Sequence, residues 1–379
     1  MFDYQKNSIY FAQAADGLES IGGAELSELG AANVRPIRRG IYFRADPAVL
    51  YRINYGSRLC TRILAPLKSF VCSDAEAIRR AAGRIDWMRF FGLNQTFAVF
   101  ANTAGSSVAH SQYAALTLKD AVVDQFRAAF GKRPTVDPKN PDLWINLHVE
   151  RERGTISIDT SGGSLHRRGY RMQSGEAPMQ ETVAAAMVHL SGWNGNAPLT
   201  DPMCGAGTLV IEAMMAYCRI PAGYLRNHFG FQQLPDFDGR VWKRVQAEAD
   251  QQIRKLPPGL INASDIDPLA VAATRANGQM VPNADQITVS QMDFAQIERI
   301  ENQTILCNPP YGIRMQGQGS LEDFYRRFGD FLKQRCKGST AYLFFGNREM
   351  IKRIGLKPAS KFPLRNGGLD GRLVKYVLY

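Results

Sequence analysis

From about residue 178 onward, apolar strand-like segments alternate with helical segments, and this alternation restricts the fold more than any other feature of the sequence. The expected elements are a helix at 178–191, a strand ending at Asp201, a helix at 207–218, and strands near 260–264, 286–290, 303–307 and 340–345. Such alternation favours an α/β fold in which a mostly parallel sheet has helices on both faces. Ligands of these sheets bind at the carboxyl ends of the strands, so functional residues are expected directly after them.

The first 160 residues show a different order of elements. A strand is expected at 8–12, a helix within 16–30, and a hairpin from 34–37 and 40–44. One strand, one helix and two further strands in so short a segment indicate a small α+β module. The pattern then stays mixed, and the elements expected in it are helices near 74–84 and 114–130 and strands at 96–101, 143–149 and 155–159.

A chain of 379 residues is longer than one hydrophobic core usually organises, so at least two domains are expected. We place the boundary at Ser161-Gly162-Gly163-Ser164, because these small residues predict a flexible connection. A basic cluster, His166 to Arg171, follows it and surrounds Tyr170 with cations. Two interpretations of the basic cluster stay open: a linker that contacts phosphates, or a solvated basic turn.

The formal net charge of +11 suggests a polyanionic partner, because a basic surface attracts phosphate backbones. Charge alone does not decide whether that partner is a nucleic acid. Residues 1–30 carry five acidic side chains, unlike a secretory signal or a transit peptide. No apolar run approaches the roughly 18 residues needed to cross a bilayer. We therefore expect a cytoplasmic protein with no membrane partner.

The cysteines predict neither a metal site nor a disulfide framework. They are widely spaced, with no C-x-x-C pair and no histidine at metal-ligand spacing. Cys204 and Cys307 stand beside two candidate motifs, and we interpret both as small residues that fit a tight turn or a strand end. The sequence does not indicate an oligomeric state.

The segment 201–208 is the first candidate site. Glycines let the backbone turn tightly and approach a ligand, and the helix that begins there points its free N–H groups at it. This geometry suits a nucleotide-like cofactor, although an ordinary strand-to-helix turn has the same pattern. A dinucleotide fingerprint would need a third glycine at Val210, so an NAD enzyme is disfavoured. The candidate cofactor-binding residues are Asp201, Met203, Cys204, Gly205, Gly207 and Thr208.

Two later strand ends carry acidic residues. Asp265 can accept hydrogen bonds from both hydroxyls of a ribose, with Ile266 packing on an adenine. Asp267 is expected to cap the helix that begins at Pro268. Asp293 offers an acceptor for an adenine amino group, and Phe294 offers an aromatic face.

The motif Asn308-Pro309-Pro310-Tyr311 follows an apolar strand and is the candidate reaction centre. Consecutive prolines fix φ and exclude helix, so the Asn308 side chain and the Pro309 carbonyl are held rigidly. The amino group of a base is a poor nucleophile, because its lone pair is delocalised into the ring. Two acceptors aimed at its N–H bonds favour the pyramidal nitrogen, while Tyr311 stacks on the base. We refer to these four residues as the N-P-P-Y motif.

These motifs resemble the bacterial RlmL-type family of 23S rRNA guanine-N2 methyltransferases. The segments that carry the resemblance are 201–212, Asp265-Ile266-Asp267-Pro268, the N-P-P-Y motif with Gly312, the basic cluster, and the closing Asn366-Gly367-Gly368-Leu369-Asp370-Gly371-Arg372-Leu373. The resemblance covers nearly the whole chain. Members of this methyltransferase family have often been labelled adenine-specific DNA methylases because they share the N-P-P-Y motif.

The resemblance implies a domain order and a cofactor. It implies a ferredoxin-like segment at 1–50, a THUMP RNA-binding domain at 51–160, a linker at 161–177, and a Rossmann-like class I methyltransferase domain at 178–379. The cofactor would be S-adenosyl-L-methionine and the partner RNA, with rRNA first.

The resemblance also assigns roles to individual residues. Asp201, Gly205 and Gly207 would line the methionine end of the cofactor. Asp265 would bind the ribose, and Asp293 the adenine. The N-P-P-Y motif would hold the target base. The family often has Leu-Lys-Glu in the helix that opens the catalytic domain, whereas this chain has Met179-Gln180-Glu181 and no charge at position 180.

Two other substrates are compatible with the N-P-P-Y motif, since any exocyclic amine fits it: guanine N2 in tRNA and adenine N6 in DNA. A DNA enzyme usually carries a separate sequence-reading module, and the sequence shows no segment of that kind. A third alternative, from another functional class, is a non-catalytic RNA-binding assembly factor, against which the intact Asn308 argues. Methylation would also require extrusion of the base, because a donor in a closed pocket cannot reach a stacked base.

Overall fold

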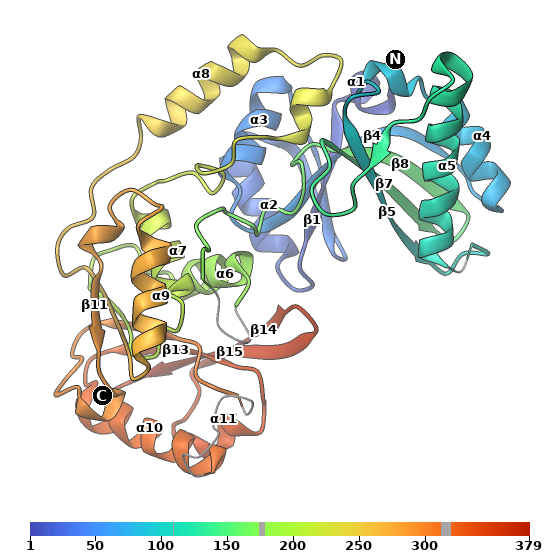
Figure 1. Ribbon diagram of the computed structural model, residues 1–379. Helices are drawn as coiled ribbons and strands as arrows, with labels where there is room; N and C mark the ends of the chain where they lie inside the picture. Colours follow the sequence, from blue (N-terminus) through green and yellow to red (C-terminus); the bar gives the residue numbers. More distant parts are fainter. Residues whose placement is uncertain (109, 174–178, 312–319) are drawn as a thin grey trace. The chain divides into compact units, whose positions relative to one another are not determined.

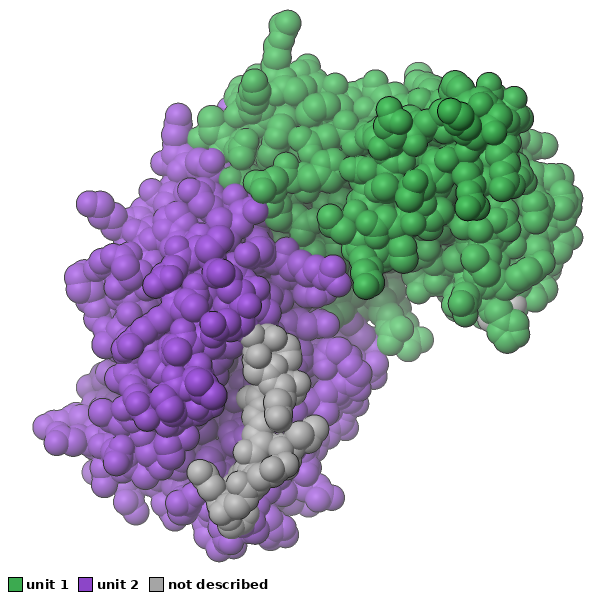
Figure 2. Space-filling model, viewed as in Figure 1, with its two compact units in different colours: residues 1–15, 19–165, 226–247 green, residues 16–18, 166–225, 248–379 purple. Residues whose placement is uncertain are grey.

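The computed structural model describes residues 1–108, 110–173, 179–311 and 320–379, and Figure 1 shows its ribbon. The chain forms two compact units, which Figure 2 colours separately. The first unit contains residues 1–15, 19–165 and 226–247, and the second contains 16–18, 166–225 and 248–379. A single cut in the sequence therefore does not separate the two units.

Within the described residues, the first unit is built on an eight-stranded sheet with strand order β2-β3-β1-β4-β8-β7-β5-β6. Strand β5 is parallel to both of its neighbours, and the other pairs are antiparallel. The strands are β1 (Ile9–Ala14), β2 (Ala32–Ile37), β3 (Gly40–Arg44), β4 (Cys60–Val71), β5 (Thr96–Ala104), β6 (Thr135–Val136), β7 (Leu143–Glu150) and β8 (Arg153–Asp159). The helices of this unit are α1 (Asp3–Asn7), α2 (Glu19–Glu28), α3 (Pro47–Gly56), α4 (Ala75–Gly83), η1 (Trp87–Arg89), α5 (Ser111–Phe130), η2 (Gly230–Gln233) and most of α8 (Gly239–Asp250).

The sequence pattern explains several of these elements. Strand β1 buries Tyr10, Ala12 and Ala14 on one face, as alternation of apolar residues predicts. Asp74 caps the start of helix α4, and its carboxylate accepts a 2.7 Å hydrogen bond from the Ala77 nitrogen. The expected strand at 8–12, the hairpin and the helices near 74–84 and 114–130 all form close to their predicted positions.

The segment 226–247 comes from the C-terminal half of the sequence but folds with the first unit. The Phe231 ring stacks on Tyr51 of α3 with their centroids 4.5 Å apart. The backbones also approach closely, because a Cβ at Gly162 would lie 2.8 Å from the Gly230 nitrogen. Glycine is therefore required at position 162, where φ is +67°.

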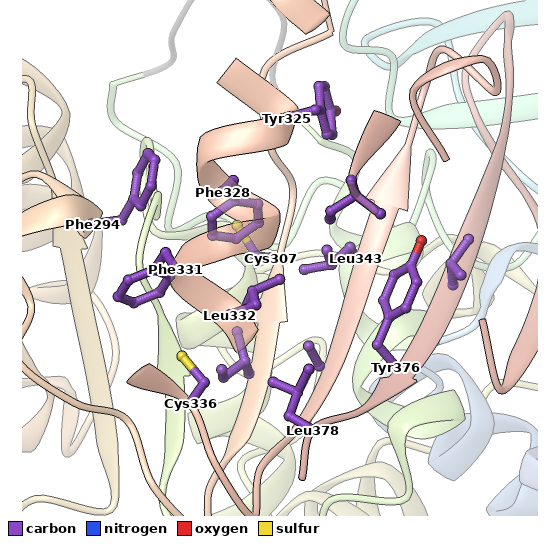
Figure 3. Packing of buried hydrophobic residues seen from close by; sticks show 14 of the residues in the cluster. Phe294, Cys307, Tyr325, Phe328, Phe331, Leu332, Cys336, Leu343, Tyr376 and Leu378 are labelled. Carbon is purple, nitrogen blue, oxygen red and sulfur yellow. The ribbon is translucent and has the colours of Figure 1, made fainter. Parts of the chain in front are cut away.

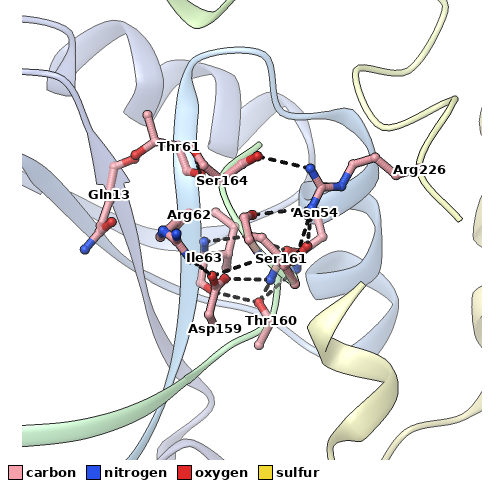
Figure 4. A network of polar contacts seen from close by, with 12 residues as sticks. Gln13, Asn54, Thr61, Arg62, Ile63, Asp159, Thr160, Ser161, Ser164 and Arg226 are labelled. Atoms are coloured by element: carbon pink, nitrogen blue, oxygen red, sulfur yellow. Dashed lines mark hydrogen bonds and ion pairs between the residues drawn. The ribbon is translucent and has the colours of Figure 1, made fainter. Parts of the chain in front are cut away.

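Residues 161–164, expected to be a flexible connection, are instead held by a polar network (Figure 4). Ser161 is buried, and its hydroxyl donates a 3.0 Å hydrogen bond to the Asn54 side chain. The Arg226 guanidinium donates to the carbonyl oxygens of Ser161 and Ser164 at 2.8 and 3.1 Å. The prediction of flexibility was wrong because these partners lie far away in sequence.

In the part of the chain that the structure describes, the second unit is built on a seven-stranded sheet with strand order β11-β10-β9-β12-β13-β15-β14. The first five strands are parallel, and β15 is antiparallel to both of its neighbours. This confirms the α/β prediction. The strands are β9 (Leu199–Asp201), β10 (Ile261–Asp265), β11 (Thr288–Gln291), β12 (Thr304–Cys307), β13 (Thr340–Phe345), β14 (Ser360–Asn366) and β15 (Leu369–Val377). The helices are α6 (Glu181–Ser191), α7 (Thr208–Tyr217), α9 (Pro268–Gly278), η3 (Ala284–Gln286), η4 (Phe294–Gln296), α10 (Leu321–Arg335) and α11 (Met350–Arg353).

Helix α10 packs on this sheet through a buried apolar cluster (Figure 3). Phe324, Phe328 and Phe331 recur at spacings of four and three residues, which places them on one face of the helix. They meet apolar side chains of β12, β13 and β15. The cluster therefore supports the strand end that leads into the N-P-P-Y motif.

Across the described ranges, no helix has the length and apolar character required to cross a bilayer. The same residues contain no group of three or more side chains arranged to hold a metal ion. All six cysteines are buried thiols.

Candidate active site

The loop between β9 and α7, residues 202–207, is built around two glycines. Gly205 and Gly207 have φ values of +55° and +81°, in the left-handed region that favours glycine. A Cβ at Gly207 would lie 2.8 Å from the Thr274 side chain. The Thr274 hydroxyl donates a 2.8 Å hydrogen bond to the Gly205 carbonyl, so helix α9 contacts and stabilises this glycine loop.

Asn277, one turn further along α9, is a residue that the sequence analysis missed. Its side chain is buried and donates to the carbonyl oxygens of Ala206 and Gln173 at 3.0 and 2.9 Å. The side-chain oxygen of Asn277 accepts a 2.8 Å hydrogen bond from the Met172 nitrogen. The i, i+3 spacing of Thr274 and Asn277 places two polar side chains on one helix face, and that spacing was the available signal.

Asp265 ends β10 and faces the glycine loop. One carboxylate oxygen accepts a 2.9 Å hydrogen bond from the Gly205 nitrogen, and the other accepts from the Asp267 nitrogen at 3.0 Å. The next residue, Ile266, is 51% exposed although it is large and apolar. Asp267 caps α9 by accepting from the Leu269 nitrogen, as predicted. The partly exposed Asp265 carboxylate thus lies beside the exposed Ile266 side chain and the glycine loop.

Asp201 is a fully buried carboxylate at the end of β9. It accepts a 3.1 Å hydrogen bond from the Met203 nitrogen and a second one from the Cys307 thiol. Burial is the main cause that raises the pKa of Asp201 to about 7, and the nearby charge of Asp265 adds to the shift. The Asp201–Cys307 hydrogen bond links the start of the glycine loop to the residue before Asn308.

The remaining predicted residues of the segment 201–208 are mostly internal. The Met203 side chain packs against the core of the second unit. Cys204 is buried beside Thr274, and burial raises the pKa of its thiol. Thr208 is buried, and its hydroxyl accepts a 3.1 Å hydrogen bond from Arg171. Their side chains shape the loop from within.

Asp293 and Phe294 follow β11, and the structure corrects one part of their prediction. Asp293 caps the short helix η4 through a 2.9 Å hydrogen bond from the Ala295 nitrogen. Phe294 is only 6% exposed, and its ring packs against Phe324, Phe328 and Phe331. The Phe294 ring therefore belongs to the core and does not offer a free aromatic face to a cofactor.

The N-P-P-Y motif begins directly after β12. The Asn308 side-chain oxygen is buried and has no hydrogen-bond partner among the described residues. Pro309 is buried, and the carbonyl oxygen of Pro310 accepts a hydrogen bond from Tyr325 of α10. Asn308 thus presents a buried acceptor that no described residue pairs with, on a backbone that is fixed by prolines and by α10.

Tyr311 packs over a glycine that the sequence analysis did not single out. A Cβ at Gly346 would lie 2.9 Å from the Tyr311 ring and 2.7 Å from Leu369. Phe344 stands edge-on to the same ring, with centroids 6.5 Å apart. Gly346 is therefore needed for the close approach of the tyrosine to β13. Gly312, which follows the N-P-P-Y motif in the resemblance, lies outside the described residues.

Neither interpretation of the basic cluster holds for Arg168. It is 1% exposed and forms a buried ion pair with Glu212 of α7 at 3.2 Å. The Tyr170 hydroxyl donates to the same carboxylate at 3.2 Å, and burial raises the pKa of Tyr170. These side chains attach the cluster to α7 and are neither solvated nor available to phosphates.

Arg171 is also held inside the second unit. Its guanidinium pairs with Glu181 at 2.9 Å and donates to the Met179 carbonyl at 2.8 Å. At the adjacent position, the Gln180 backbone nitrogen donates a 3.0 Å hydrogen bond to the Asn366 side chain. The closing Asn-Gly-Gly motif therefore holds the start of α6 through the backbone of residue 180, and this contact does not require the charge found there in the family.

The strand order brings these separate motifs together. Strands β10, β9 and β12 are neighbours and parallel, so the chain after each strand lies at one edge of the sheet. A bare glycine loop, the Asp265 carboxylate and exposed Ile266 fit a nucleoside-containing cofactor. The buried Asn308 acceptor at the next strand end fits an amine substrate. The fold and site define an S-adenosylmethionine-dependent methyltransferase.

Comparison with known proteins identifies the family to which the chain belongs. It belongs to the family of the RMKL-like methyltransferase domain, whose profile matches residues 168–375. The profile of the THUMP domain matches residues 72–159, and that of the RlmL ferredoxin-like domain matches residues 10–64. These matches confirm the resemblance drawn from the motifs.

Individual relatives agree with this assignment. The chain is 41% identical to the "Putative RNA methyltransferase slr0064" of Synechocystis sp., over 98% of this chain and 97% of that protein. It is 34% identical to the ribosomal RNA large subunit methyltransferase K/L of Photobacterium profundum, over 97% of this chain and 53% of that protein. The chain therefore spans about half the length of the K/L relatives it matches.

Among solved structures, the fold is similar to SMU.472, described as "a putative methyltransferase complexed with SAH". The TM-score is 0.84 at 27% identity, and the alignment covers 98% of both chains. A protein with the same fold along its whole length thus binds the demethylated form of the cofactor.

Proposed function

We propose that this protein transfers a methyl group from S-adenosylmethionine to the exocyclic N2 amino group of a guanine in 23S rRNA. The observation that carries the proposal is the buried side-chain oxygen of Asn308, which has no partner among the described residues and is held next to two prolines at the end of β12. The names of the K/L relatives and the matched THUMP profile support RNA as the substrate.

The residues of the second unit divide the work between cofactor and base. The glycine loop, Asp201, Asp265 and Ile266 would hold the cofactor, together with the backbone at Asp293. S-adenosylmethionine supplies an electrophilic methyl group when it is bound. Exposed Ile266 would pack on the adenine, and the Asp265 carboxylate would bind the ribose.

The N-P-P-Y motif would prepare the amine for attack. The Asn308 oxygen and the Pro309 carbonyl accept hydrogen bonds from the two N–H groups, which favours the pyramidal nitrogen. Tyr311 stacks on the base and fixes its plane. The amine becomes acidic only as the new bond forms, so its proton can leave late to solvent without a strong base.

We further propose the domain division 1–50, 51–160, 161–177 and 178–379, in which the first two parts bind RNA and the last performs methyl transfer in the cytoplasm. The segment 226–247 is a part of the catalytic sequence that folds with the RNA-binding unit. Residues 174–178 of the linker region lie outside the described residues.

The substrate can be tested with labelled S-adenosylmethionine. Purified protein is incubated separately with total rRNA, tRNA and genomic DNA from cells that lack the protein, and labelled nucleosides are identified by mass spectrometry. The proposal expects label in N2-methylguanosine of 23S rRNA. Label confined to tRNA would transfer the assignment to a tRNA guanine-N2 enzyme, and label confined to N6-methyladenine would make it a DNA enzyme.

A further inference from the structure

Asn146 in β7 is a buried amide whose side chain has no hydrogen-bond partner in the part of the chain that the structure describes. The residue is 1% exposed, and neither its nitrogen nor its oxygen is paired with any of the described residues. An unpaired buried amide costs free energy, because both groups have lost their hydrogen bonds to water. Such groups in folded proteins call for an explanation, and one explanation is a ligand.

The neighbours of Asn146 are aromatic residues on the same face of the sheet. Trp144 lies two residues earlier on β7 and therefore points to the same face. Phe100 of β5 is directly opposite Asn146 in the parallel ladder. The Phe100 and Trp144 rings meet edge-to-face with centroids 5.8 Å apart, and both are partly exposed.

Arg62 of β4 extends over these two rings. Its guanidinium carbon lies 4.4 Å from the centroid of Phe100 and 5.1 Å from that of Trp144. Arg62 also forms an ion pair with the buried carboxylate of Asp159, visible in Figure 4, and its side chain remains 18% exposed. A cation that reaches solvent thus covers the two aromatic rings.

This combination matches a nucleotide of single-stranded RNA. A side-chain amide offers a donor and an acceptor side by side, which is the pattern of a base edge. Partly exposed aromatic rings stack on bases of any sequence, and an arginine can pair with phosphate. The bases of a duplex are already paired and stacked, so a duplex would leave the amide unpaired.

We propose that Asn146, Phe100, Trp144 and Arg62 form a binding site for an unpaired RNA base on the sheet of the first unit. Arg62 covers the two aromatic rings in the absence of RNA, and it exchanges its contact with Asp159 for a phosphate when RNA binds. The base stacks on the aromatic rings, and its edge pairs with the Asn146 amide. The inference rests on the proposed RNA substrate and assigns the residues that bind it outside the catalytic unit.

Asn146→Leu tests the site, because leucine has a similar volume and cannot pair with a base. Fluorescein-labelled single-stranded RNA oligonucleotides of about 12 nucleotides serve as probes, without cofactor, and binding is followed by fluorescence anisotropy. We expect affinity to fall about tenfold, the loss that corresponds to one base contact. The melting temperature should stay level or rise, because an unpaired buried amide has been removed.

Phe100→Leu is a second variant that keeps the test decisive if Asn146→Leu folds poorly. It should weaken binding of the same oligonucleotides without loss of fold. Phe70→Leu is the matched control, since Phe70 is another partly buried aromatic residue on this sheet and its ring instead covers Gly154. This control should bind RNA like wild type.

Three results would overturn the proposal: wild-type protein that does not bind single-stranded oligonucleotides, unchanged affinity in both test variants, or a lower melting temperature of Asn146→Leu with unchanged affinity. The last result would make Asn146 a structural residue. None of these results depends on which nucleoside is methylated, so failure of this site and failure of the proposed function can be distinguished.

Discussion

The hydroxyl of Tyr325 in α10 donates a 3.1 Å hydrogen bond to the carbonyl oxygen of Pro310. Tyr325 is completely buried, and its ring stacks on Phe345 with centroids 5.4 Å apart. Burial raises the pKa of Tyr325 far above its usual value, so the hydroxyl keeps its proton. The aromatic core under the N-P-P-Y motif thus fixes the motif through one directed bond.

Tyr325→Phe removes this bond and leaves the ring in place. We expect kcat to fall roughly three- to tenfold, the value of one hydrogen bond of about 1 kcal/mol, with unchanged affinity for S-adenosylmethionine. Steady-state kinetics and calorimetric titration of the cofactor measure the two effects. Tyr376→Phe is the control, because the Tyr376 hydroxyl lies in the same core and has no partner among the described residues. Equal kcat values for the two variants would contradict the role given to Tyr325.

Gly207→Ala tests the shape of the cofactor loop. A left-handed backbone costs an alanine about 1–2 kcal/mol, and here the new methyl group would also collide with Thr274. Gly192→Ala is the matched control, because Gly192 has a φ of +68° at a helix end and open space around it. We expect a larger loss of cofactor affinity and of melting temperature at Gly207. Similar losses at both positions would show that the approach of Thr274 is unimportant.

Asp201 should make stability depend on pH. Its pKa is about 7 in the folded protein and near 3.8 when unfolded, so between these values only the folded chain holds the proton. Stability is therefore lost as pH rises from about 4 through 7. Asp201→Asn keeps a neutral side chain and should lack this component. Melting temperatures of both proteins between about pH 5 and pH 8 should diverge in slope, and parallel curves would show that Asp201 is ionised when folded.

The buried Arg168–Glu212 pair predicts a strongly non-additive mutant cycle. Breaking a buried pair from one side typically costs about 3–5 kcal/mol, because one charge is left buried and unpaired. Arg168→Met and Glu212→Leu should each destabilise the protein more than the double variant does, as measured by urea unfolding. Arg168→Met should not change RNA affinity at a temperature where it is folded. A loss of RNA affinity in the folded variant would restore the linker interpretation.

The parts of the fold that the sequence predicted are those set by local pattern. Strand ends that carry Asp201, Asp265 and Asn308 follow apolar runs, and Pro268 marks the start of α9 after its Asp267 cap. Each of these features can be recognised within a few residues. Because the strands are parallel, their carboxyl ends and the residues that follow them lie at one edge of the sheet. This placement can therefore be predicted from the expected fold class alone.

The predictions that failed depended on partners far away in sequence. The basic sequence around Arg168 favours an exposed side chain, but Arg168 is buried and pairs with Glu212, which lies 44 positions away in the sequence. Phe294 stands at a strand end like a ligand residue, yet α10 encloses its ring. Likewise, the pattern of 226–247 does not reveal which unit its aromatic rings will join. Burial of these side chains is decided by tertiary packing, which a local pattern does not encode.

The claim that Asn308 prepares an amine for methylation is tested most directly by single-turnover methylation of 23S rRNA. Wild-type and Asn308→Ala proteins are compared with cofactor and RNA both saturating, and the affinities of both ligands are measured separately. We predict that the rate of N2-methylguanosine formation falls about 100-fold or more in Asn308→Ala, while both affinities stay within about twofold of wild type. An equal rate in the two proteins would contradict the account.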